Sequence, residues 1–155
     1  MKRLILLDLD HTIIYGSYAE NETADLLFQY NKFLKVYERP FAKELIAICK
    51  ESADIIVYTT ALRSYAIKIC KKLNINPVEI LSRKHCLKIN NQWHKKVKLE
   101  WEKKYAKIII IDDSPNVWIT NNIPSIFLIP SEFRGNSKDN GLIKIITEYQ
   151  LLKSK

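Results

Sequence analysis

The sequence predicts an α/β fold in which a parallel sheet is flanked by helices. Three runs of aliphatic residues lack the polar alternation of a half-exposed strand, which is typical of strands buried on both faces of a parallel sheet. Segments with helical spacing of apolar residues lie between these runs, so the order favours a doubly wound sheet with right-handed crossovers. No repeat or Pro/Gly-rich linker divides the 155 residues, and we expect a single domain over residues 1–155.

Four short aliphatic runs are the predicted strands of this sheet. The first three are almost purely aliphatic, whereas the fourth is weaker and is closed by Pro130. Side chains of such runs can pack on both faces of a sheet. In chain order, the predicted strands cover residues 3–9, 54–58, 107–111 and 125–129.

Four segments in which apolar residues recur at helical spacing are the predicted helices. The first begins at Pro40, because proline fits the first turn of a helix. It places on one face Phe41, Leu45, Ile46 and Ile48. The three others cover residues 61–73, 97–105 and 137–152.

Two further segments interrupt the alternation of strands and helices. Residues 33–37 are predicted to form an extra strand inserted after the first one. Residues 86–89 and 92–94 are predicted to form a small hairpin around Asn90 and Asn91. Both should lie over the carboxyl edge of the sheet, where folds of this class bind ligands. The sequence does not fix the conformation of residues 15–31.

Composition excludes several classes of protein. The chain has 47% hydrophobic residues and no apolar run of the roughly 18 to 20 residues that cross a bilayer. Asp8 and Asp10 interrupt the amino-terminal apolar run too early for a signal peptide. The three cysteines include no CxxC pair, which favours reduced and mostly buried thiols. We therefore expect a cytoplasmic monomer with no membrane partner.

Polar residues stand at the end of each of the first three predicted strands. Asp8 and Asp10 lie at the end of the first, on one side of the chain, whereas Thr59 and Thr60 follow the second, and Asp112 and Asp113 follow the third. Any one of these aspartates alone could be a turn former or a helix N-cap. Together, they would converge at neighbouring strand ends of a parallel sheet, where their repulsion favours a hard divalent cation such as Mg²⁺.

These residues resemble the motifs of a known family. The segment Asp8-Leu9-Asp10-His11-Thr12 matches the DxDx(T/V) signature of haloacid-dehalogenase-like (HAD) phosphohydrolases. The segments VYERP (36–40), YTTALRSYA (58–66) and DDSP (112–115) are similar to those of one HAD branch. That branch is the small CTD phosphatases, also called NLI-interacting-factor-like or TFIIF-associated CTD phosphatases. The resemblance implies a HAD-like Rossmannoid sheet with a small β insertion and no large cap domain.

The resemblance also implies a catalytic role for each motif residue. Asp8 would be the nucleophile that forms an aspartyl-phosphate, and Asp10 would protonate the leaving oxygen and later activate water. Mg²⁺ would be held by Asp8, the backbone carbonyl of Asp10, and Asp112 or Asp113. Thr59 would hydrogen-bond the phosphoryl group, whereas Thr60 would be structural.

The family also has a lysine that balances the phosphate charge, and two residues compete for this role. Counting back from Asp112 selects Lys96, whereas matching residues 93–97 to the family segment selects Lys95. The chain departs from the family pattern in lacking the aspartate after the lysine. A second departure is Asp113, which stands where the small phosphatases often have asparagine. His11 fills a variable position and is expected to support the site or face solvent.

Substrate class is inferred from the lengths of the insertions. Neither residues 10–59 nor residues 60–112 can accommodate a full cap domain, and an open site suits a macromolecular substrate. We expect a phosphate on a protein segment or a nucleic-acid end, and the family resemblance implies a phosphorylated protein or peptide carrying phosphoserine or phosphothreonine. The net charge of +8 would also allow nucleic acid to bind, through basic and aromatic residues near the hairpin. These candidates are Lys84, His85, Lys88, Trp93, His94, Lys95 and Lys96.

Two alternative functions stay open on the sequence alone. The first is a phosphatase acting on polynucleotide ends, which the charge and the basic hairpin favour. The second is a catalytically silent binding module with the same fold. The presence of Asp8, Asp10, Thr59 and the pair Asp112–Asp113 argues against a silent site.

Overall fold

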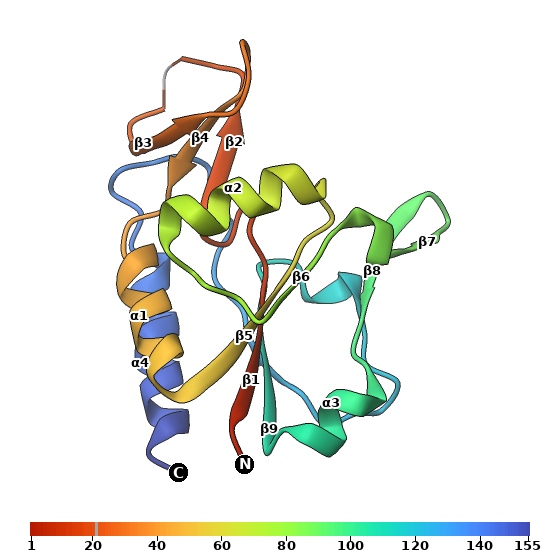
Figure 1. Ribbon diagram of the computed structural model, residues 1–155. Helices are drawn as coiled ribbons and strands as arrows, with labels where there is room; N and C mark the ends of the chain where they lie inside the picture. Colours follow the sequence, from red (N-terminus) through yellow and green to blue (C-terminus); the bar gives the residue numbers. More distant parts are fainter. Residues whose placement is uncertain (21) are drawn as a thin grey trace.

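A five-stranded parallel sheet forms the centre of the computed structural model, which describes residues 1–20 and 22–155. Its strand order is β11-β9-β1-β5-β6 (Figure 1). The central strand β1 pairs in parallel with β5 and β9, so that Leu6 lies between Ile56 and Ile110. The strands are β1 (Arg3–Leu7), β5 (Ala53–Tyr58), β6 (Glu79–Leu81), β9 (Lys107–Ile111) and β11 (Ile126–Leu128). The predicted α/β class is confirmed, with one further edge strand, β6.

Helices cover both faces of the sheet. On one face, α1 (Ala42–Ser52) and α4 (Gly141–Lys153) lie side by side, and α2 (Arg63–Leu73) packs near them (Figure 1). The shorter α3 (Leu99–Lys104) covers the other face. Helices can pack on both faces because alternate side chains of β1 point to opposite faces of the sheet. Ile5 and Leu7 belong to the first hydrophobic core, whereas Leu4 and Leu6 belong to the second.

The helix boundaries differ from the predicted ones at several ends. α1 begins at Ala42 and not at Pro40, because Phe41 adopts a left-handed conformation with φ 70° and the Ala42 N–H closes a turn onto Arg39 O. Phe41 is exposed, so its predicted place on the buried face was wrong. α2 begins at Arg63, two residues later than predicted, and ends at Leu73 as predicted; the left-handed Asn74 caps it, with its N–H donating to the carbonyls of Cys70 and Lys71.

A three-stranded antiparallel sheet is inserted between β1 and α1. It has the order β2-β4-β3, with β2 (Ile14–Ser17), β3 (Asp25–Gln29) and β4 (Lys35–Glu38). The single strand predicted at 33–37 corresponds to β4, displaced by two residues at its start because Phe33 and Leu34 belong to a turn in which Asn31 Oδ1 accepts their backbone N–H groups. The other two strands fall in the segment that the sequence left undecided.

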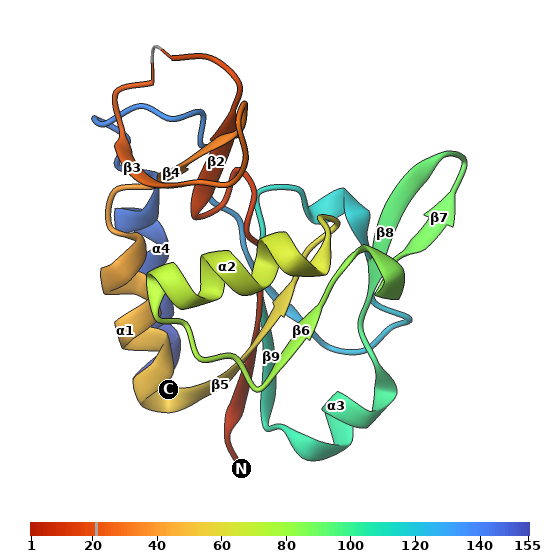
Figure 2. The same ribbon diagram turned by 45° about the horizontal axis from the view of Figure 1, so that its top comes forward.

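A second small sheet contains the predicted hairpin. β7 (Leu87–Ile89) and β8 (Gln92–Lys96) are antiparallel and joined by Asn90 and Asn91, both left-handed as a two-residue hairpin turn requires. The short strand β10 (Trp118–Ile119) pairs in parallel with β8. Two 3₁₀ helices lie at Arg83–His85 and Pro115–Val117. Figure 2 shows the hairpin and the β2-β4-β3 sheet on either side of the carboxyl edge of the main sheet.

Two of the composition-based expectations can be compared with the structure. Cys49 and Cys70 are buried and Cys86 is half-buried, and all three thiols are free. Over residues 1–20 and 22–155, no helix is both long enough and apolar enough to cross a membrane.

Candidate active site

The carboxyl ends of β1 and β9 bring the predicted acidic residues together. Asp8 directly follows β1, and its N–H donates to Ile111 O of β9 at 3.0 Å. Asp112 directly follows β9. A small cavity of about 130 Å³ opens where these strands end. Its lining consists of Asp8, Asp10, His11, Thr60, Lys95, Asp112, Asp113, Ser114 and Val117.

Lys95 is buried between two of these carboxylates. Its Nζ donates to Asp8 Oδ1 at 2.8 Å and to Asp112 Oδ2 at 2.7 Å, and the side chain is only 2% exposed. Burial by itself would lower the pKa of Lys95, but the charges of Asp8 and Asp112 outweigh burial and raise it. Lys95 is therefore held as a cation inside the site.

Asp112 accepts three hydrogen bonds that fix its orientation. Its Oδ2 accepts from Lys95 and from Trp118 Nε1 at 2.8 Å, while its Oδ1 accepts from the Ser114 N–H at 2.8 Å. Burial, and then the nearby charge of Asp8, raise the pKa of Asp112 to about 6. Burial thus makes the charged form of Asp112 costly, and the neighbouring carboxylate of Asp8 adds to that cost.

Thr12 connects the first motif to the third. Its Oγ1 donates to Asp8 Oδ2 at 2.7 Å and accepts the N–H of Asp113 at 3.0 Å. Asp8 is therefore held at both carboxylate oxygens, by Lys95 on one and Thr12 on the other. Burial raises the pKa of Asp8, against the opposing effect of Lys95 and Thr12.

The acidic cluster has the composition and spacing of a site for a hard cation. Asp8, Asp112 and Asp113 each offer one carboxylate oxygen, and these oxygens lie within 4.8 Å of one another. Oxygen ligands of this kind suit Mg²⁺, which retains several waters in protein sites. The residues present thus fit such an ion. The side chain of Asp10 does not belong to this group, in keeping with the expectation that only its backbone carbonyl would be a ligand.

Asp10 lines the cavity and is turned toward α2. Its Oδ1 accepts a hydrogen bond from Tyr65 Oη at 3.0 Å. Burial raises the pKa of Asp10, and the bond from Tyr65 opposes that shift only in part. A carboxyl group with a raised pKa is suited to donate a proton near neutral pH.

Of the two candidate lysines, the structure brings only Lys95 to the carboxylates. Lys96 is exposed because neighbouring residues of β8 point to opposite faces, and its backbone N–H donates to Tyr58 Oη. Of the basic and aromatic residues named near the hairpin, only Lys95 lines the cavity. Trp93 is covered by the guanidinium of Arg83 and the ammonium of Lys88, which lie 5.7 and 5.3 Å from its ring centroid.

The two threonines after β5 are arranged differently from the expectation. Thr59 is buried, and its Oγ1 accepts the N–H of Ala61 at 3.0 Å. Thr60, which was expected to be structural, lines the cavity.

The sequence analysis missed two contacts within the candidate site, those of Tyr65 with Asp10 and of Trp118 with Asp112. Tyr65 was treated only as part of the apolar face of a helix, although its hydroxyl and its place in the YTTALRSYA segment were the available signal.

A buried arginine, Arg39, holds the loop that follows β1 and carries the first motif. Arg39 is fully buried, and its Nη1 donates to Thr12 O at 3.0 Å. Its Nε and Nη2 donate to the two carboxylate oxygens of Asp139, at 2.7 and 3.2 Å. Arg39 therefore ties the loop that carries Asp8 to the segment that leads into α4.

Replacing Arg39 with methionine should lower the free energy of unfolding by about 3–5 kcal/mol, because the change leaves the carboxylate of Asp139 without its cation and removes the donor to the carbonyl of Thr12. Urea denaturation measures the loss. Arg134→Met is the matched control, since Arg134 pairs with Glu132 at the surface and its loss should leave the free energy of unfolding nearly unchanged. Equal losses in the two variants would contradict the role given to Arg39.

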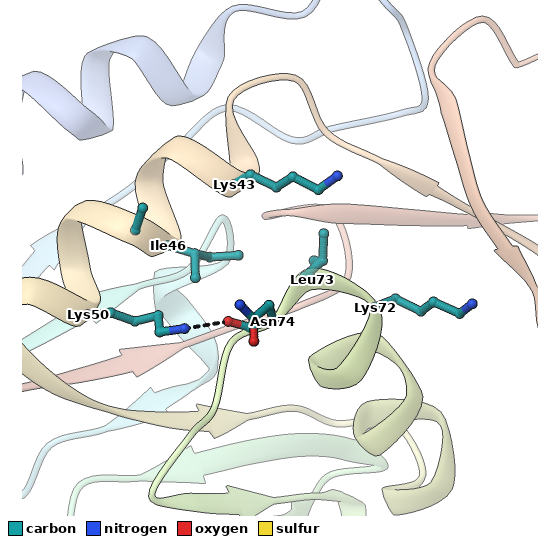
Figure 3. Close-up of a pocket in the computed structure, with 7 residues that line it drawn as sticks. Lys43, Ile46, Lys50, Lys72, Leu73 and Asn74 are labelled. Carbon is teal, nitrogen blue, oxygen red and sulfur yellow. Dashed lines mark hydrogen bonds between the residues drawn. The ribbon is translucent and has the colours of Figure 1, made fainter.

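A second cavity, of about 210 Å³, lies between α1 and the end of α2 (Figure 3). It contains Lys43, Lys50 and Lys72. Lys50 Nζ donates to Asn74 O at 2.7 Å, and Lys43 Nζ lies 3.5 Å from Glu38 Oε1. Lys50 and Lys43 are thus paired with groups of the fold, and the candidate catalytic residues lie in the other cavity, at the strand ends.

A comparison with protein-family models and curated proteins finds relatives over nearly the whole chain. Residues 3–155 match the model described as NLI interacting factor-like phosphatase. An uncharacterized protein of Schizosaccharomyces pombe is 26% identical over 94% of this chain and 46% of its own length. Phosphatase PSR1 of Saccharomyces cerevisiae is 24% identical over 94% of this chain and 35% of its own length.

Solved structures share the fold at lower sequence identity. Fission yeast RNA polymerase II CTD phosphatase Fcp1, bound to beryllium fluoride, has a TM-score of 0.58 and 18% identity, over 97% of this chain and 50% of that one. Another structure of Fcp1, described as an essential RNA polymerase II CTD phosphatase, has a TM-score of 0.57 and 20% identity. The match covers 99% of this chain and 50% of that one. The chain thus spans half or less of each of these proteins.

Proposed function

Because the chain belongs to the NLI interacting factor-like phosphatase family, we propose that it is a Mg²⁺-dependent phosphatase that removes phosphate from phosphoserine or phosphothreonine of a protein. The observation that carries the proposal is the position of Asp8, held at one oxygen by Lys95 and at the other by Thr12, at the base of an open cavity. Residues 1–155 act in this proposal as a single catalytic domain.

In the first half of the reaction, Asp8 is the nucleophile. One of its carboxylate oxygens forms a bond to phosphorus, and the bond between phosphorus and the serine or threonine oxygen breaks. The leaving oxygen keeps that electron pair and takes a proton from Asp10. Asp8 then carries the phosphoryl group as an aspartyl-phosphate, and the dephosphorylated residue departs.

In the second half, Asp10 works in the opposite direction. Its carboxylate accepts a proton from a water molecule, whose oxygen bonds to phosphorus while the bond to Asp8 breaks. Inorganic phosphate leaves, and both aspartates return to their starting protonation states.

The charges of the site explain how a carboxylate can approach a phosphate. Lys95 stays protonated between Asp8 and Asp112 and offers positive charge to the phosphoryl oxygens. Mg²⁺ would be held by Asp8, the backbone carbonyl of Asp10, and Asp112 or Asp113, and would supply further positive charge that favours transfer. The hydroxyl of Thr12 keeps the carboxylate of Asp8 in place, and the backbone N–H of Ser114 does the same for Asp112.

The shape of the site supports a macromolecular substrate. A cavity of about 130 Å³ is large enough for a phosphoryl group and little else, so the remainder of the substrate must lie outside it. No separate cap domain is inserted among the described residues of the chain, and the two small sheets flank the opening. Two of the solved relatives are described as phosphatases of the RNA polymerase II CTD, which is consistent with a protein substrate here.

Metal removal and a choice of substrates test this proposal. With Mg²⁺ at mildly acidic pH, we expect turnover of p-nitrophenyl phosphate and of phosphoserine peptides, its loss on adding EDTA, and its return with excess Mg²⁺. Beryllium fluoride with Mg²⁺ should raise the melting temperature, as a ligand of the native state does. Activity that survives EDTA would exclude the metal-dependent mechanism.

The substrates compared in this experiment should also include 3′- and 5′-phosphorylated oligonucleotides. The exposed cations Lys84, Lys88 and Lys96 favour this second substrate class. We expect the phosphopeptides to be turned over faster. Faster turnover of the oligonucleotides would identify a polynucleotide-end phosphatase, and no turnover of any substrate would indicate a binding module.

A further inference from the structure

Tyr65 reaches from α2 to the carboxyl group of Asp10. Its hydroxyl donates to Asp10 Oδ1 at 3.0 Å, and the side chain is 6% exposed. Within the part of the chain that the structure describes, this is the one side-chain hydrogen bond of Asp10. One oxygen of Asp10 is thus occupied, while Oδ2 is available on a residue that lines the cavity.

The tyrosine hydroxyl has a closely defined position. The ring of Tyr30 packs edge-on against the ring of Tyr65, with centroids 5.2 Å apart. On the other side lies Gly16 of β2, where an added Cβ would be only 3.0 Å from the Tyr65 hydroxyl. The Tyr65 hydroxyl therefore lies close to the inserted β2-β4-β3 sheet. A side chain at position 16 would crowd this hydroxyl, whereas glycine leaves room for it.

We propose that Tyr65 is a positioning residue that holds Asp10 so that Oδ2 carries the proton delivered to the leaving oxygen. This inference rests on the proposed phosphatase function. As the phosphorus–oxygen bond breaks, the leaving oxygen keeps the electron pair and takes the proton from Oδ2. The new carboxylate of Asp10 is then stabilised by the hydrogen bond at Oδ1, and Tyr65 keeps its own proton throughout.

This role makes the importance of Tyr65 depend on the leaving group. A serine or threonine oxygen is a strong base and leaves readily only when it is protonated. The p-nitrophenolate group is a weak base and can leave without a proton. Tyr65 should therefore matter for phosphoserine peptides and matter little for p-nitrophenyl phosphate.

Tyr65→Phe tests the proposal, because it removes the hydroxyl and keeps the ring. We compare kcat/KM, which reports the steps up to release of the leaving group and leaves out the second half that both substrates share. We expect kcat/KM for a phosphoserine peptide to fall at least about tenfold, and kcat/KM for p-nitrophenyl phosphate to change less than about threefold. Tyr30→Phe is the matched control. Its hydroxyl contacts Ser64 Oγ at 3.0 Å and does not reach Asp10, so both kcat/KM values should be unchanged. Gly16→Ala, which crowds the same hydroxyl, should reproduce the leaving-group dependence with both rings retained.

Three results would overturn this inference. Equal losses on both substrates in Tyr65→Phe would indicate a structural role. A fall in kcat/KM for the peptide that comes entirely from weaker peptide binding would indicate a contact with substrate. A parent protein that turns over neither substrate would overturn the proposed function and this inference with it, whereas the first two results leave the phosphatase function intact.

Discussion

Replacing Asp8 with asparagine is expected to lower turnover of p-nitrophenyl phosphate by at least about a thousandfold. An amide cannot form an acyl phosphate at the rate of a carboxylate, and Asp8 is the carboxylate that directly follows the central strand β1. Lys95 donates to one of its oxygens and Thr12 to the other. Turnover is measured with Mg²⁺ in excess, at equal protein concentrations.

Asp54→Asn is the matched control for this prediction. Asp54 lies in β5, away from the cavity, and contacts Lys2 and Tyr105. We expect it to leave turnover unchanged. Asp8→Ala should be as inactive as Asp8→Asn, and alanine cannot regenerate aspartate by deamidation. If either Asp8 variant keeps more than about a tenth of the activity, Asp8 is not the nucleophile.

Replacing Lys95 with methionine should have the second large effect, on stability as well as on activity. In metal-free protein we expect the free energy of unfolding to fall by about 3–5 kcal/mol, because the change leaves the buried carboxylates of Asp8 and Asp112 without their shared cation. Urea denaturation in EDTA measures this loss. Phosphatase activity should fall as well, since the phosphoryl group loses its protein cation.

Adding Mg²⁺ distinguishes a charge effect from a packing effect in this variant. A cation bound by the carboxylates should restore part of the lost free energy of unfolding. Stability lost because the lysine stem left a void would not return with Mg²⁺. Lys96→Met is the matched control on the same strand, because Lys96 is exposed and should change the free energy of unfolding by about 0.5 kcal/mol or less. Similar losses in the two variants, or no recovery with Mg²⁺, would contradict the account.

The main sheet could be predicted from the sequence because its strands are buried on both faces. The predicted strand 107–111 coincides with β9, and the predicted strand 54–58 lacks only the first residue of β5. The first strand was extended too far. Leu9 is fully buried and aliphatic, yet β1 ends at Leu7, since the chain turns so that Ile13 and Ile14 donate to Leu9 O. Hydrophobicity alone does not distinguish a buried loop from a strand.

The remainder of the site depends on contacts between distant segments. The choice between Lys95 and Lys96 required the pleat of β8, because adjacent residues of a strand point in opposite directions and two motif alignments disagreed by one position. The bond between Tyr65 and Asp10 joins residues 55 positions apart. The β2-β4-β3 sheet was largely missed, because β3 is mostly exposed and lacks a regular apolar pattern.

Chemical trapping of the phosphorylated enzyme tests the central claim most directly. Protein mixed with p-nitrophenyl phosphate and Mg²⁺ is treated with sodium borohydride, which reduces an acyl phosphate to an alcohol. Mass spectrometry of the tryptic peptide 4–32 should then find homoserine at position 8, and the Asp8→Asn variant should give none. Steady turnover with no reduced residue at position 8, or with homoserine at another aspartate, would contradict the account.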